Sequence, residues 1–421
     1  MLEQITCPAD LRRLSHDDLG LLSHEIRNFI VETVQENGGH LGSNLGVVEL
    51  TIALHRVFDS PRDIMLWDTG HQAYVHKMLT GRLENFKSLR KAGGLSGYPS
   101  RAESEHDWIE NSHASTALSY AFGIATAQAS DEGEGRRVLA VIGDGALTGG
   151  MAFEGLNNLG HAGSNAIIIL NDNGRSYAPT VSLLSDSLKK LRNNPKYLEQ
   201  QEKLENKVKS LLPSKEVMGL SVERAIDAAK AAVREIWDPT SFFEDLGLRY
   251  NGPFDGHNIE ALEKAFRNAA GFEGPTVIHV LTEKGRGYGP AENDPIKRLH
   301  DIGKPKPESY TAAFTEILIK EAENRSDLVA ITAAMPDSTG LLPFSERFPE
   351  RFFDVGIAEQ HATTAAAGMA MGGLRPVIAV YATFLNRAFD QINFDVALHN
   401  QPVIFCIDRA GITGPDGASH H

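Results

Sequence analysis

Short, uninterrupted apolar runs separated by helical patterns dominate the first half of this chain. Residues 138–142 and 166–170 are runs of Val, Ile, Leu and Ala bounded by glycine and asparagine, with a helical pattern between them. Runs this short and this uniformly apolar are typical of strands covered on both faces of a parallel sheet. The pattern therefore predicts a strand–helix–strand unit whose two strands end at the same edge of one sheet.

Residues 1–60 carry a different pattern, in which apolar side chains recur at helical spacing, with Ser15 as a candidate helix cap. The segment 47–58 is mostly apolar and predicts a buried helix. Charged residues dominate the stretch from about 188 to 238, which we interpret as exposed amphipathic helices outside the sheet. A further buried strand is predicted over 275–282, and it runs into a segment rich in Gly, Lys and Arg.

A second α/β pattern follows residues 303–311, whose Pro, Gly and Lys content is that of a linker. A helix is predicted over 311–322, and further strands are predicted in the segments LVAIT, FFDV, PVIAVYATF and PVIFCIDRAG. The fold class is therefore α/β, with two successive domains of parallel sheets flanked by helices. We place them at residues 1–305 and 306–421.

Composition narrows the class of protein. At 421 residues the chain is too long for a single hydrophobic core, and 42% hydrophobic with 23% charged residues is an ordinary globular balance. The net charge of −14 argues against nucleic acid as a partner. Two cysteines are too few for a disulfide framework or a zinc cluster. Neither a membrane-spanning run nor the apolar core of a signal peptide is visible, so we expect a cytoplasmic protein.

Polar residues follow both central strands. The first ends in Gly143, Asp144 and Gly145, and the second ends in a segment that includes Asn173. Each tripeptide alone is better explained as a turn. Together at one sheet edge, they offer a carboxylate and an amide oxygen, which suit Mg²⁺ completed by phosphate oxygens. The glycines would let the backbone approach those phosphates closely.

Histidines recur in turns flanked by Gly or Ser. His40 lies in GGHLGSNLG, His71 in WDTGHQAY and His113 in NSHAST, where Ser115 begins a helix of small residues. A helix start of this kind readily holds phosphate. Each histidine alone is better explained as a structural residue, but three in such turns indicate a common pocket. Lys284 and His300 follow the strand predicted at 275–282 and lie on the same ligand side.

Glu359 is the candidate acid. It follows the apolar strand of FFDVGIAEQH and opens a helix of small residues. The simple explanation is a glutamate that interacts with the helix dipole. Partial burial there would instead raise its pKa and allow it to share a proton with a ring nitrogen.

The pairing of GDG with NDN resembles the diphosphate signature of thiamine diphosphate enzymes. Further segments resemble the 1-deoxy-D-xylulose-5-phosphate synthase family over nearly the whole chain: GGHLGSNLG, WDTGHQAYVHK, ESEHDWIENSHAST, VIGDGALTGGMAFE, PFDGHN, EKGRGYGPAENDP, FFDVGIAEQHA, YATFLNRAFDQ and FCIDRAGITGPDGASHH. The resemblance implies decarboxylation of pyruvate on thiamine diphosphate with Mg²⁺, and transfer of the two-carbon unit to glyceraldehyde 3-phosphate. The product feeds isoprenoid, thiamine and pyridoxal synthesis.

Carried over position by position, the resemblance implies four sets of residues. The catalytic set is Glu359, His40, His71, Lys284, His300 and His420. The cofactor-binding set is His71, Ser115, Gly143, Gly145, Ala146, Asn173, Lys284, Glu359 and Phe384. The metal ligands are Asp144, Asn173 and the main-chain carbonyl of Arg175. The substrate-facing set is Tyr381, Arg387, Arg409 and Asp416. Arg409 is the candidate for the sugar phosphate, because a guanidinium can bind phosphate as a fork; its alternative is a surface ion pair.

The chain ends at His421, inside a motif that in the family continues into the rest of the second domain and a third domain. We therefore expect an incomplete second domain, no third domain, and exposed apolar surface and strand edges. Two alternatives to an active synthase stay open: a fragment that binds the cofactor without turnover, and a related thiamine enzyme such as a transketolase or a keto-acid dehydrogenase component. The resemblance also implies a homodimer, with the site between the first two domains of one chain.

Overall fold

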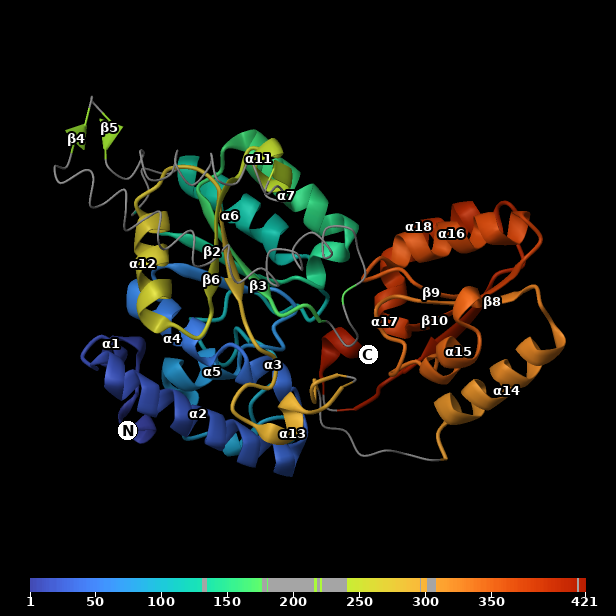
Figure 1. Cartoon of the computed structure of the whole chain (residues 1–421), viewed down its shortest axis with the longest axis horizontal. Coiled ribbons are helices and arrows are strands. Elements are labelled where there is room, and N and C mark those ends of the chain that lie inside the picture. Colours follow the sequence, from blue (N-terminus) through green and yellow to red (C-terminus); the bar gives the residue numbers. More distant parts are fainter. Residues whose placement is uncertain are drawn as a thin grey trace.

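Two parallel β-sheets, one after the other along the chain, organise the molecule (Figure 1). The computed structural model describes residues 1–130, 135–175, 180, 216–217, 220–221, 241–295, 297–300, 308–414 and 416–421. The first sheet and its helices lie on the left of Figure 1 and the second on the right, and the C-terminal end lies between them. The predicted α/β fold class with two successive domains is confirmed.

The first sheet has five parallel strands in the order β1-β2-β3-β7-β6. The strands are β1 (Ile64–Trp67), β2 (Val138–Gly143), β3 (Ala166–Asp172), β6 (Arg249–Asp255) and β7 (Thr276–Leu281). Val138 pairs with Ala166 and Gly143 with Asn171, so β2 and β3 end side by side. Both are buried along almost their whole length, as the apolar runs predict.

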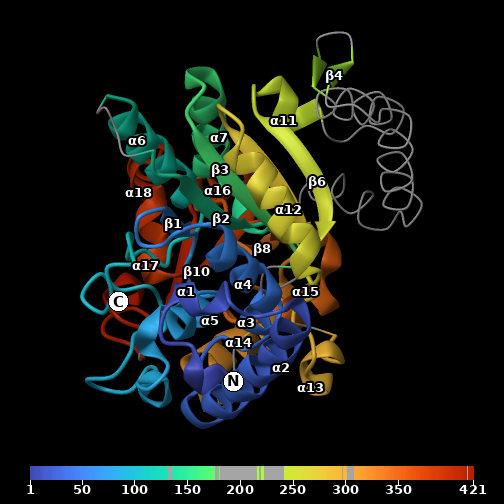
Figure 2. The ribbon, with the colours of Figure 1, turned by 90° about the vertical axis from the view of Figure 1, so that its left-hand side faces the viewer.

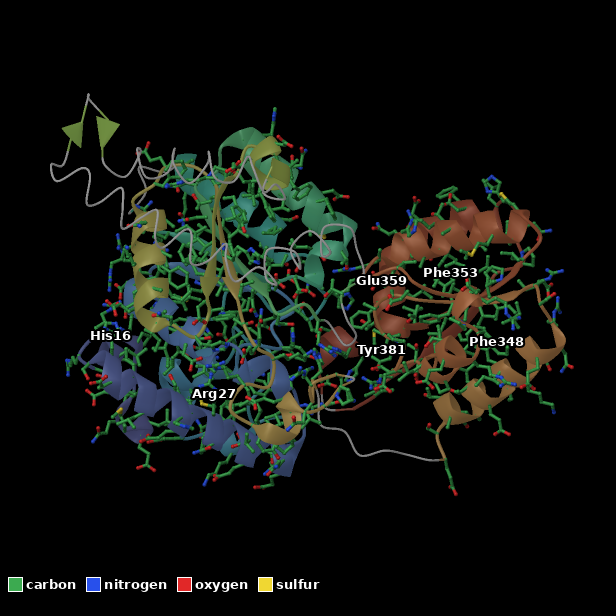
Figure 3. All side chains as sticks on the ribbon, viewed as in Figure 1. His16, Arg27, Phe348, Phe353, Glu359 and Tyr381 are labelled. Carbon is green, nitrogen blue, oxygen red and sulfur yellow. The ribbon has the colours of Figure 1, made fainter. Side chains whose placement is uncertain are left out.

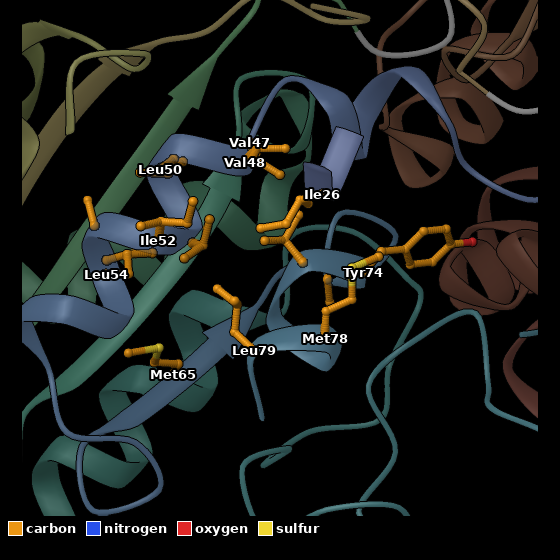
Figure 4. Packing of buried hydrophobic residues seen from close by; sticks show 14 of the residues in the cluster. Ile26, Val47, Val48, Leu50, Ile52, Leu54, Met65, Tyr74, Met78 and Leu79 are labelled. Carbon is orange, nitrogen blue, oxygen red and sulfur yellow. The ribbon is translucent and has the colours of Figure 1, made fainter. Parts of the chain in front are cut away.

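Helices cover both faces of this sheet. They are α1 (Pro8–Leu11), α2 (His16–Asn37), α3 (Gly42–Leu45), α4 (Val48–Val57), α5 (Tyr74–Lys77), α6 (Ala117–Ser130), α7 (Gly150–Ala162), α11 (Ser241–Asp245), α12 (Ile259–Ala270) and α13 (Gly289–Glu292). Because successive residues of a strand face opposite sides, Leu139 and Val141 pack with α2, α4 and α12, whereas Ala140 packs with α6 and α7. Figure 4 shows part of the packing on the face covered by α2, α4 and α12. Leu50, Ile52 and Leu54 of α4 belong there to the same buried cluster as Met65 of β1.

The second sheet has four parallel strands in the order β11-β10-β8-β9. They are β8 (Leu328–Thr332), β9 (Phe352–Asp354), β10 (Arg375–Tyr381) and β11 (Ile404–Asp408). Its helices are α14 (Tyr310–Asn324), α15 (Leu342–Arg347), α16 (Glu359–Met371), α17 (Ala382–Leu385) and α18 (Phe389–Gln391). The edge strand β11 is half exposed, with Ile404 at 51% and Ile407 at 48%. Figure 2 shows β8 and β10 lying behind the helices of the first part.

Short 3₁₀ or π turns complete the described elements: η1 (Leu2–Gln4), η2 (Met78–Arg82), η3 (Phe86–Ser88), η4 (Ala146–Thr148), η5 (Pro349–Arg351), η6 (Asn386–Ala388), η7 (Ile392–Ala397) and η8 (Ala418–His420). Most of the stretch 188–238 that we interpreted as exposed helices lies outside the described residues. Within it the structure describes two paired antiparallel strands, β4 (Glu216–Val217) and β5 (Leu220–Ser221), which that interpretation missed. Much of the predicted linker at 303–311 is likewise outside the description. Among the described residues, no helix combines the length and apolar character that crossing a membrane requires.

Candidate active site

A pocket of roughly 950 Å³, counted with its open mouth, lies where the two sheets face each other. The segments that follow β1, β2, β3 and β7 line one side, and those that follow β8, β9, β10 and β11 line the other. The carboxyl ends of parallel strands are where α/β sheets bind ligands. The predicted site residues that line the pocket are His40, His71, Gly143, Asp144, Gly145, Ala146, Asn173, Arg175, Lys284, His300, Glu359, Phe384, Arg387 and His420.

His40, His71 and His300 form one cluster, whereas His113, the third histidine of the predicted common pocket, does not line the pocket. The ring centroids of His40 and His71 are 5.4 Å apart, those of His40 and His300 are 5.5 Å apart, and those of His71 and His300 are 5.1 Å apart. Burial, with the charge of Arg90 in second place, lowers the pKa of His40 to about 3. Burial also lowers the pKa values of His71 and His300 well below their usual range. All three imidazoles are therefore neutral near pH 7.

Asn44, which sequence reasoning missed, holds the backbones of two of these histidines together. Its side-chain amide donates to the carbonyl oxygens of His40 and His71, at 2.8 Å each. Its carbonyl oxygen accepts from the backbone N–H of Tyr74 at 2.9 Å. Asn44 itself is fully buried. One amide thus positions two turns that are far apart in the sequence.

Lys284 reaches the same cluster from the end of β7. Its Nζ lies 2.7 Å from Nδ1 of His300, and the hydroxyl of Ser43 lies 3.2 Å from the same nitrogen. Lys284 and His300 are both buried, at 6% and 5% exposure. Both line the pocket, on the ligand side of the first sheet where the sequence analysis places them.

The turn that follows β3 lies against the turn that follows β2. The backbone N–H of Asn173 is 3.4 Å from Oδ1 of Asp144, and the hydroxyl of Thr180 donates to Oδ2 of Asp144 at 2.7 Å. The side-chain oxygen of Asn173 accepts from the backbone N–H of Arg175 at 3.1 Å. The described residues contain no group of three or more His, Cys, Asp or Glu side chains suited to a metal. A metal here would have to use one carboxylate together with amide, carbonyl and ligand oxygens.

Asp68, which sequence reasoning missed, organises the start of α6. Its carboxylate accepts from the backbone N–H groups of Ser115 at 2.8 Å and Ala117 at 3.0 Å. Burial raises the pKa of Asp68, although these bonds oppose the rise. Ser115 does not line the pocket, but its hydroxyl donates to the carbonyl of Ala146 at 2.6 Å. A signal was present, because Asp68 follows strand β1 as Asp144 follows β2.

Glu359 enters the pocket from the second part of the chain as the first residue of α16 (Figure 3). It is 6% exposed, and burial raises its pKa, as expected from its position, with a smaller opposing effect from Arg387. Just before it, the backbone N–H of Ile357 donates to the hydroxyl of Thr148 at 2.8 Å. This bond joins the two parts of the chain beside the carboxyl group.

Three predicted substrate residues do not line the pocket. Tyr381 stacks on Phe384 with ring centroids 5.7 Å apart, and the guanidinium of Arg409 lies 4.2 Å from the Tyr381 ring centroid. Asp416 accepts from Arg90 at 2.6 Å. Tyr381 thus contacts a lining residue, Phe384, whereas the partners of Arg409 and Asp416 do not line the pocket.

His420 comes from the second part of the chain and is held by two hydroxyls of the first. Its Nδ1 lies 3.0 Å from Oγ of Ser112, and its Nε2 lies 3.4 Å from the hydroxyl of Tyr98. The rings of Tyr98 and His420 are stacked at 5.3 Å. Burial lowers the pKa of His420 to about 4. Tyr98 and Ser112 were missed, because nothing in their local sequence distinguishes them from other loop residues.

The pocket wall also carries polar atoms with capacity for a ligand. Within the described part of the chain, three buried lining atoms have no hydrogen-bond partner: Nδ1 of His40, Nδ1 of His71 and Nε2 of Gln72. Buried polar groups are normally paired, so these atoms are suited to a bound molecule. A Cβ added at Gly143 would meet no atom within 4 Å, so glycine is not required there by protein packing. Space beside its backbone is open to a ligand.

Comparison with known proteins gives one consistent family. A family model described as 1-deoxy-D-xylulose-5-phosphate synthase matches residues 2–282, and one described as transketolase, pyrimidine binding domain, matches residues 306–421. The chain is 56% identical over 431 aligned residues to 1-deoxy-D-xylulose-5-phosphate synthase of Mycobacterium avium (strain 104), and 56% identical over 433 to that of Nocardia farcinica (strain IFM 10152). All of this chain is covered, with 67% and 68% of those proteins.

Solved structures of similar architecture include two transketolases. The one from Leishmania mexicana has a TM-score of 0.47 and 16% identity, covering 92% of this chain and 68% of that one. The one from Campylobacter jejuni has a TM-score of 0.47 and 17% identity, covering 94% and 70%.

Proposed function

Because this chain belongs to the 1-deoxy-D-xylulose-5-phosphate synthase family, we propose that the pocket between its two sheets holds thiamine diphosphate and Mg²⁺. The reaction joins the two-carbon unit of pyruvate to glyceraldehyde 3-phosphate, giving 1-deoxy-D-xylulose 5-phosphate and CO₂. One observation carries the proposal: a buried carboxyl of the second part, Glu359, shares one pocket with the Asp144 and Asn173 turns of the first. The chain is thereby assigned to the transketolase-type transferases of isoprenoid and thiamine biosynthesis.

The residues around the pocket fit this cofactor. Thiamine diphosphate supplies a carbon nucleophile and an electron sink for decarboxylation. Gly143, Gly145 and Ala146 border the open space where a diphosphate would lie, and Ser115 supports Ala146 from behind. His71 and Lys284 contribute polar atoms from the same side. Phe384 offers an aromatic face for the ring of the cofactor.

Mg²⁺ would be held by the carboxylate of Asp144, the amide oxygen of Asn173 and the main-chain carbonyl of Arg175. This is a hard oxygen set with one formal charge, so phosphate oxygens are needed to complete the coordination. Thr180 already orients the Asp144 carboxylate by a 2.7 Å bond, and the two turns lie in contact. The geometry therefore supports a metal that binds together with the diphosphate.

Glu359 is the proton-sharing residue. Burial raises its pKa, so the carboxyl retains a proton more readily than an exposed glutamate and can share it with a ring nitrogen of the cofactor. His40, His71 and His300 of the first part and His420 of the second are the catalytic histidines, and each is neutral near pH 7. Neutral imidazoles can accept or relay protons next to the reacting carbon without repelling Lys284.

The anionic substrates need local positive charge, because the whole chain carries −14. Arg387 lines the pocket, and the guanidinium of Arg409 lies over the ring of Tyr381, which stacks on the lining residue Phe384. Arg409 would bind the sugar phosphate as a fork. Asp416, held by Arg90, would orient a substrate hydroxyl.

Three further assignments belong to the same proposal. Domain limits at 1–305 and 306–421 are supported by the matches at 2–282 and 306–421. A homodimer and a cytoplasmic location follow from the family resemblance. The main alternative is a module that binds the cofactor without turnover.

The test is release of CO₂ from pyruvate by this chain with thiamine diphosphate and Mg²⁺, with and without glyceraldehyde 3-phosphate. We expect release that depends on the aldehyde and is lost in Glu359→Ala, whereas the exposed control Glu350→Ala keeps it. Cofactor binding measured by calorimetry, without any release, would favour the binding module. Release with another aldose phosphate in preference to glyceraldehyde 3-phosphate would favour a transketolase-like acceptor choice.

A further inference from the structure

The segment PFDGHN, residues 253–258, spans the end of β6 and the turn into α12, and it does not line the pocket. The backbone N–H of His257 donates to Oδ1 of Asp255 at 2.9 Å, and Asn258 caps α12 by accepting from Ala261 at 3.0 Å. The His257 side chain is only 7% exposed. These two hydrogen bonds fix the turn before and after His257. The imidazole of His257 is buried, and it has no role in the proposed reaction.

Both ring nitrogens of His257 have partners. Nε2 accepts from the backbone N–H of Glu283 at 3.0 Å, and Nδ1 lies 3.0 Å from Oε2 of Glu49. A backbone amide can only donate, so Nε2 carries the lone pair and the proton sits on Nδ1. Glu49 must therefore accept from Nδ1. The hydrogen-bond pattern determines the tautomer without further assumption.

Arg27 keeps the Glu49 carboxylate ionised, so that it can only accept hydrogen bonds. Figure 3 labels Arg27 among the helices of the first part of the chain. The guanidinium makes two bonds of 2.6 Å to the two carboxylate oxygens and also donates to the carbonyl of Leu45. Burial alone would raise the pKa of Glu49, but the bonds from His257 and Arg27 outweigh it and lower the pKa to about 2. The carboxylate stays ionised through the physiological range.

The amide that His257 holds immediately precedes Lys284. On the other side, the N–H of Gly285 donates to the carbonyl of Gly42 at 2.8 Å. A Cβ added at Gly46 would come within 2.9 Å of the Glu283 carbonyl oxygen, so this backbone packs closely on the helices below. The backbone is therefore held on both sides of Lys284, by the His257 imidazole at Glu283 and by the Gly42 carbonyl at Gly285. Lys284 lines the pocket between these two contacts.

We propose that His257, aligned by Glu49 and Arg27, is a positioning residue that sets the placement of the Lys284 ammonium in the pocket. The residue acts through the backbone of Glu283 and touches neither cofactor nor substrate. The inference rests on the proposed function only in that Lys284 serves the cofactor. Sequence spacing alone does not suggest it, because Glu49, His257 and Glu283 are distant from one another in the chain.

The experiment compares His257→Leu, His257→Gln and the unmodified chain. Hydrogen–deuterium exchange of the peptide covering 281–286, measured without cofactor, reports the Glu283 amide directly. We expect exchange about tenfold faster in His257→Leu, the effect of losing one hydrogen bond. His257→Gln retains an acceptor and should exchange within about threefold of the unmodified chain. Thiamine diphosphate affinity and kcat should fall at least about tenfold in the Leu variant and recover in the Gln variant.

His106→Leu is the matched control, because His106 is a partly buried histidine that bonds a side chain, Ser60, outside the pocket. It should change neither the exchange at 281–286 nor cofactor affinity. Unchanged exchange in His257→Leu would overturn the inference, as would faster exchange with unaltered affinity and turnover. If the unmodified chain showed no turnover, that result would count against the proposed function alone. The role of His257 would then be decided by two remaining measurements, hydrogen–deuterium exchange at 281–286 and the affinity for thiamine diphosphate.

Discussion

The two sheets bring very different surroundings to one pocket. On the first side, polar groups are held by other polar groups: Asn44 holds two histidine backbones, Asp68 holds the start of α6, and Thr180 holds Asp144. On the second side, Glu359 is a carboxyl whose pKa is raised chiefly by burial. A surface that must bind charged phosphates and a metal needs many oriented dipoles, whereas a residue that must keep a proton needs mainly to be kept from water.

The sheets also differ in packing. β2 and β3 are buried along their length, but the edge strand β11 is half exposed. Substitutions in β2 and β3 should therefore cost more stability than substitutions in β11, whereas the central strands β8 and β10 of the second sheet are buried like β2 and β3.

The largest expected effect is on stability. Ile169→Ala removes a fully buried side chain from the centre of β3, and Ile407→Ala removes one that is 48% exposed on β11. We expect the first to lower the free energy of unfolding by about 2–5 kcal/mol and the second by less than about 1 kcal/mol. Urea titration followed by circular dichroism measures both. Equal losses would mean that β11 is packed as tightly as β3.

A smaller but sharper effect is expected at the metal turn. Asp144→Asn keeps the size of the side chain and removes the only carboxylate of the proposed metal set. The Mg²⁺ concentration that half-saturates thiamine diphosphate binding should rise about 100-fold, since even groups that support a metal ligand are worth 10- to 100-fold. Calorimetry at several Mg²⁺ concentrations gives the value, with the exposed Asp390→Asn as control. A shift below threefold would remove Asp144 from the metal site.

The buried histidines predict loss of stability in acid. The pKa of His40 is about 3 in the folded chain against 6.5 for the free side chain, because burial and then the charge of Arg90 disfavour its protonation. Below pH 6.5 the unfolded chain binds a proton that the folded chain does not, so stability falls as the pH drops towards 3. The slope approaches about 1.4 kcal/mol per pH unit well below pH 6.5 and is half of that at pH 6.5 itself.

His40→Gln should therefore lose about 1 kcal/mol less than the unmodified chain when urea titrations at pH 6.5 and 5.5 are compared, because the histidine of the unfolded chain is already half protonated at pH 6.5. His399→Gln, on the exposed surface, provides the control and should follow the unmodified chain. Parallel losses in His40→Gln and the unmodified chain would show that His40 titrates alike in both states.

The smallest expected effect concerns the contact that joins the two sides. Ser112→Ala removes the hydroxyl 3.0 Å from Nδ1 of His420. Loss of one hydrogen bond of this kind costs about 0.5–1.5 kcal/mol, which predicts a two- to tenfold loss of kcat/KM for pyruvate. The ¹⁵N spectrum of the histidine rings should show a changed tautomer balance at His420. An unaltered His420 signal would mean that Ser112 does not orient it.

Much of this arrangement was predictable from local pattern. The apolar runs identified β2, β3 and β8, and polar residues directly after strands identified Asp144, Asn173 and Lys284. The signal was available but overlooked for Asp68, which follows β1 in the same way. Tyr98, Ser112 and Asn44 carried no local signal, because their importance lies only in what they contact.

By itself, the sequence determined the order of strands and helices, the burial of the central strands and the sheet edge where the polar residues gather. Periodicity and burial are local properties, and a run of Val and Ile reports them wherever the chain goes next. Only the tertiary structure decided that His257 holds the amide before Lys284, that Ser112 meets His420, and that Glu359 shares a pocket with Asp144. Such contacts join distant segments, and they depend on how helices pack on the two sheets and how the sheets face each other, which no local pattern records.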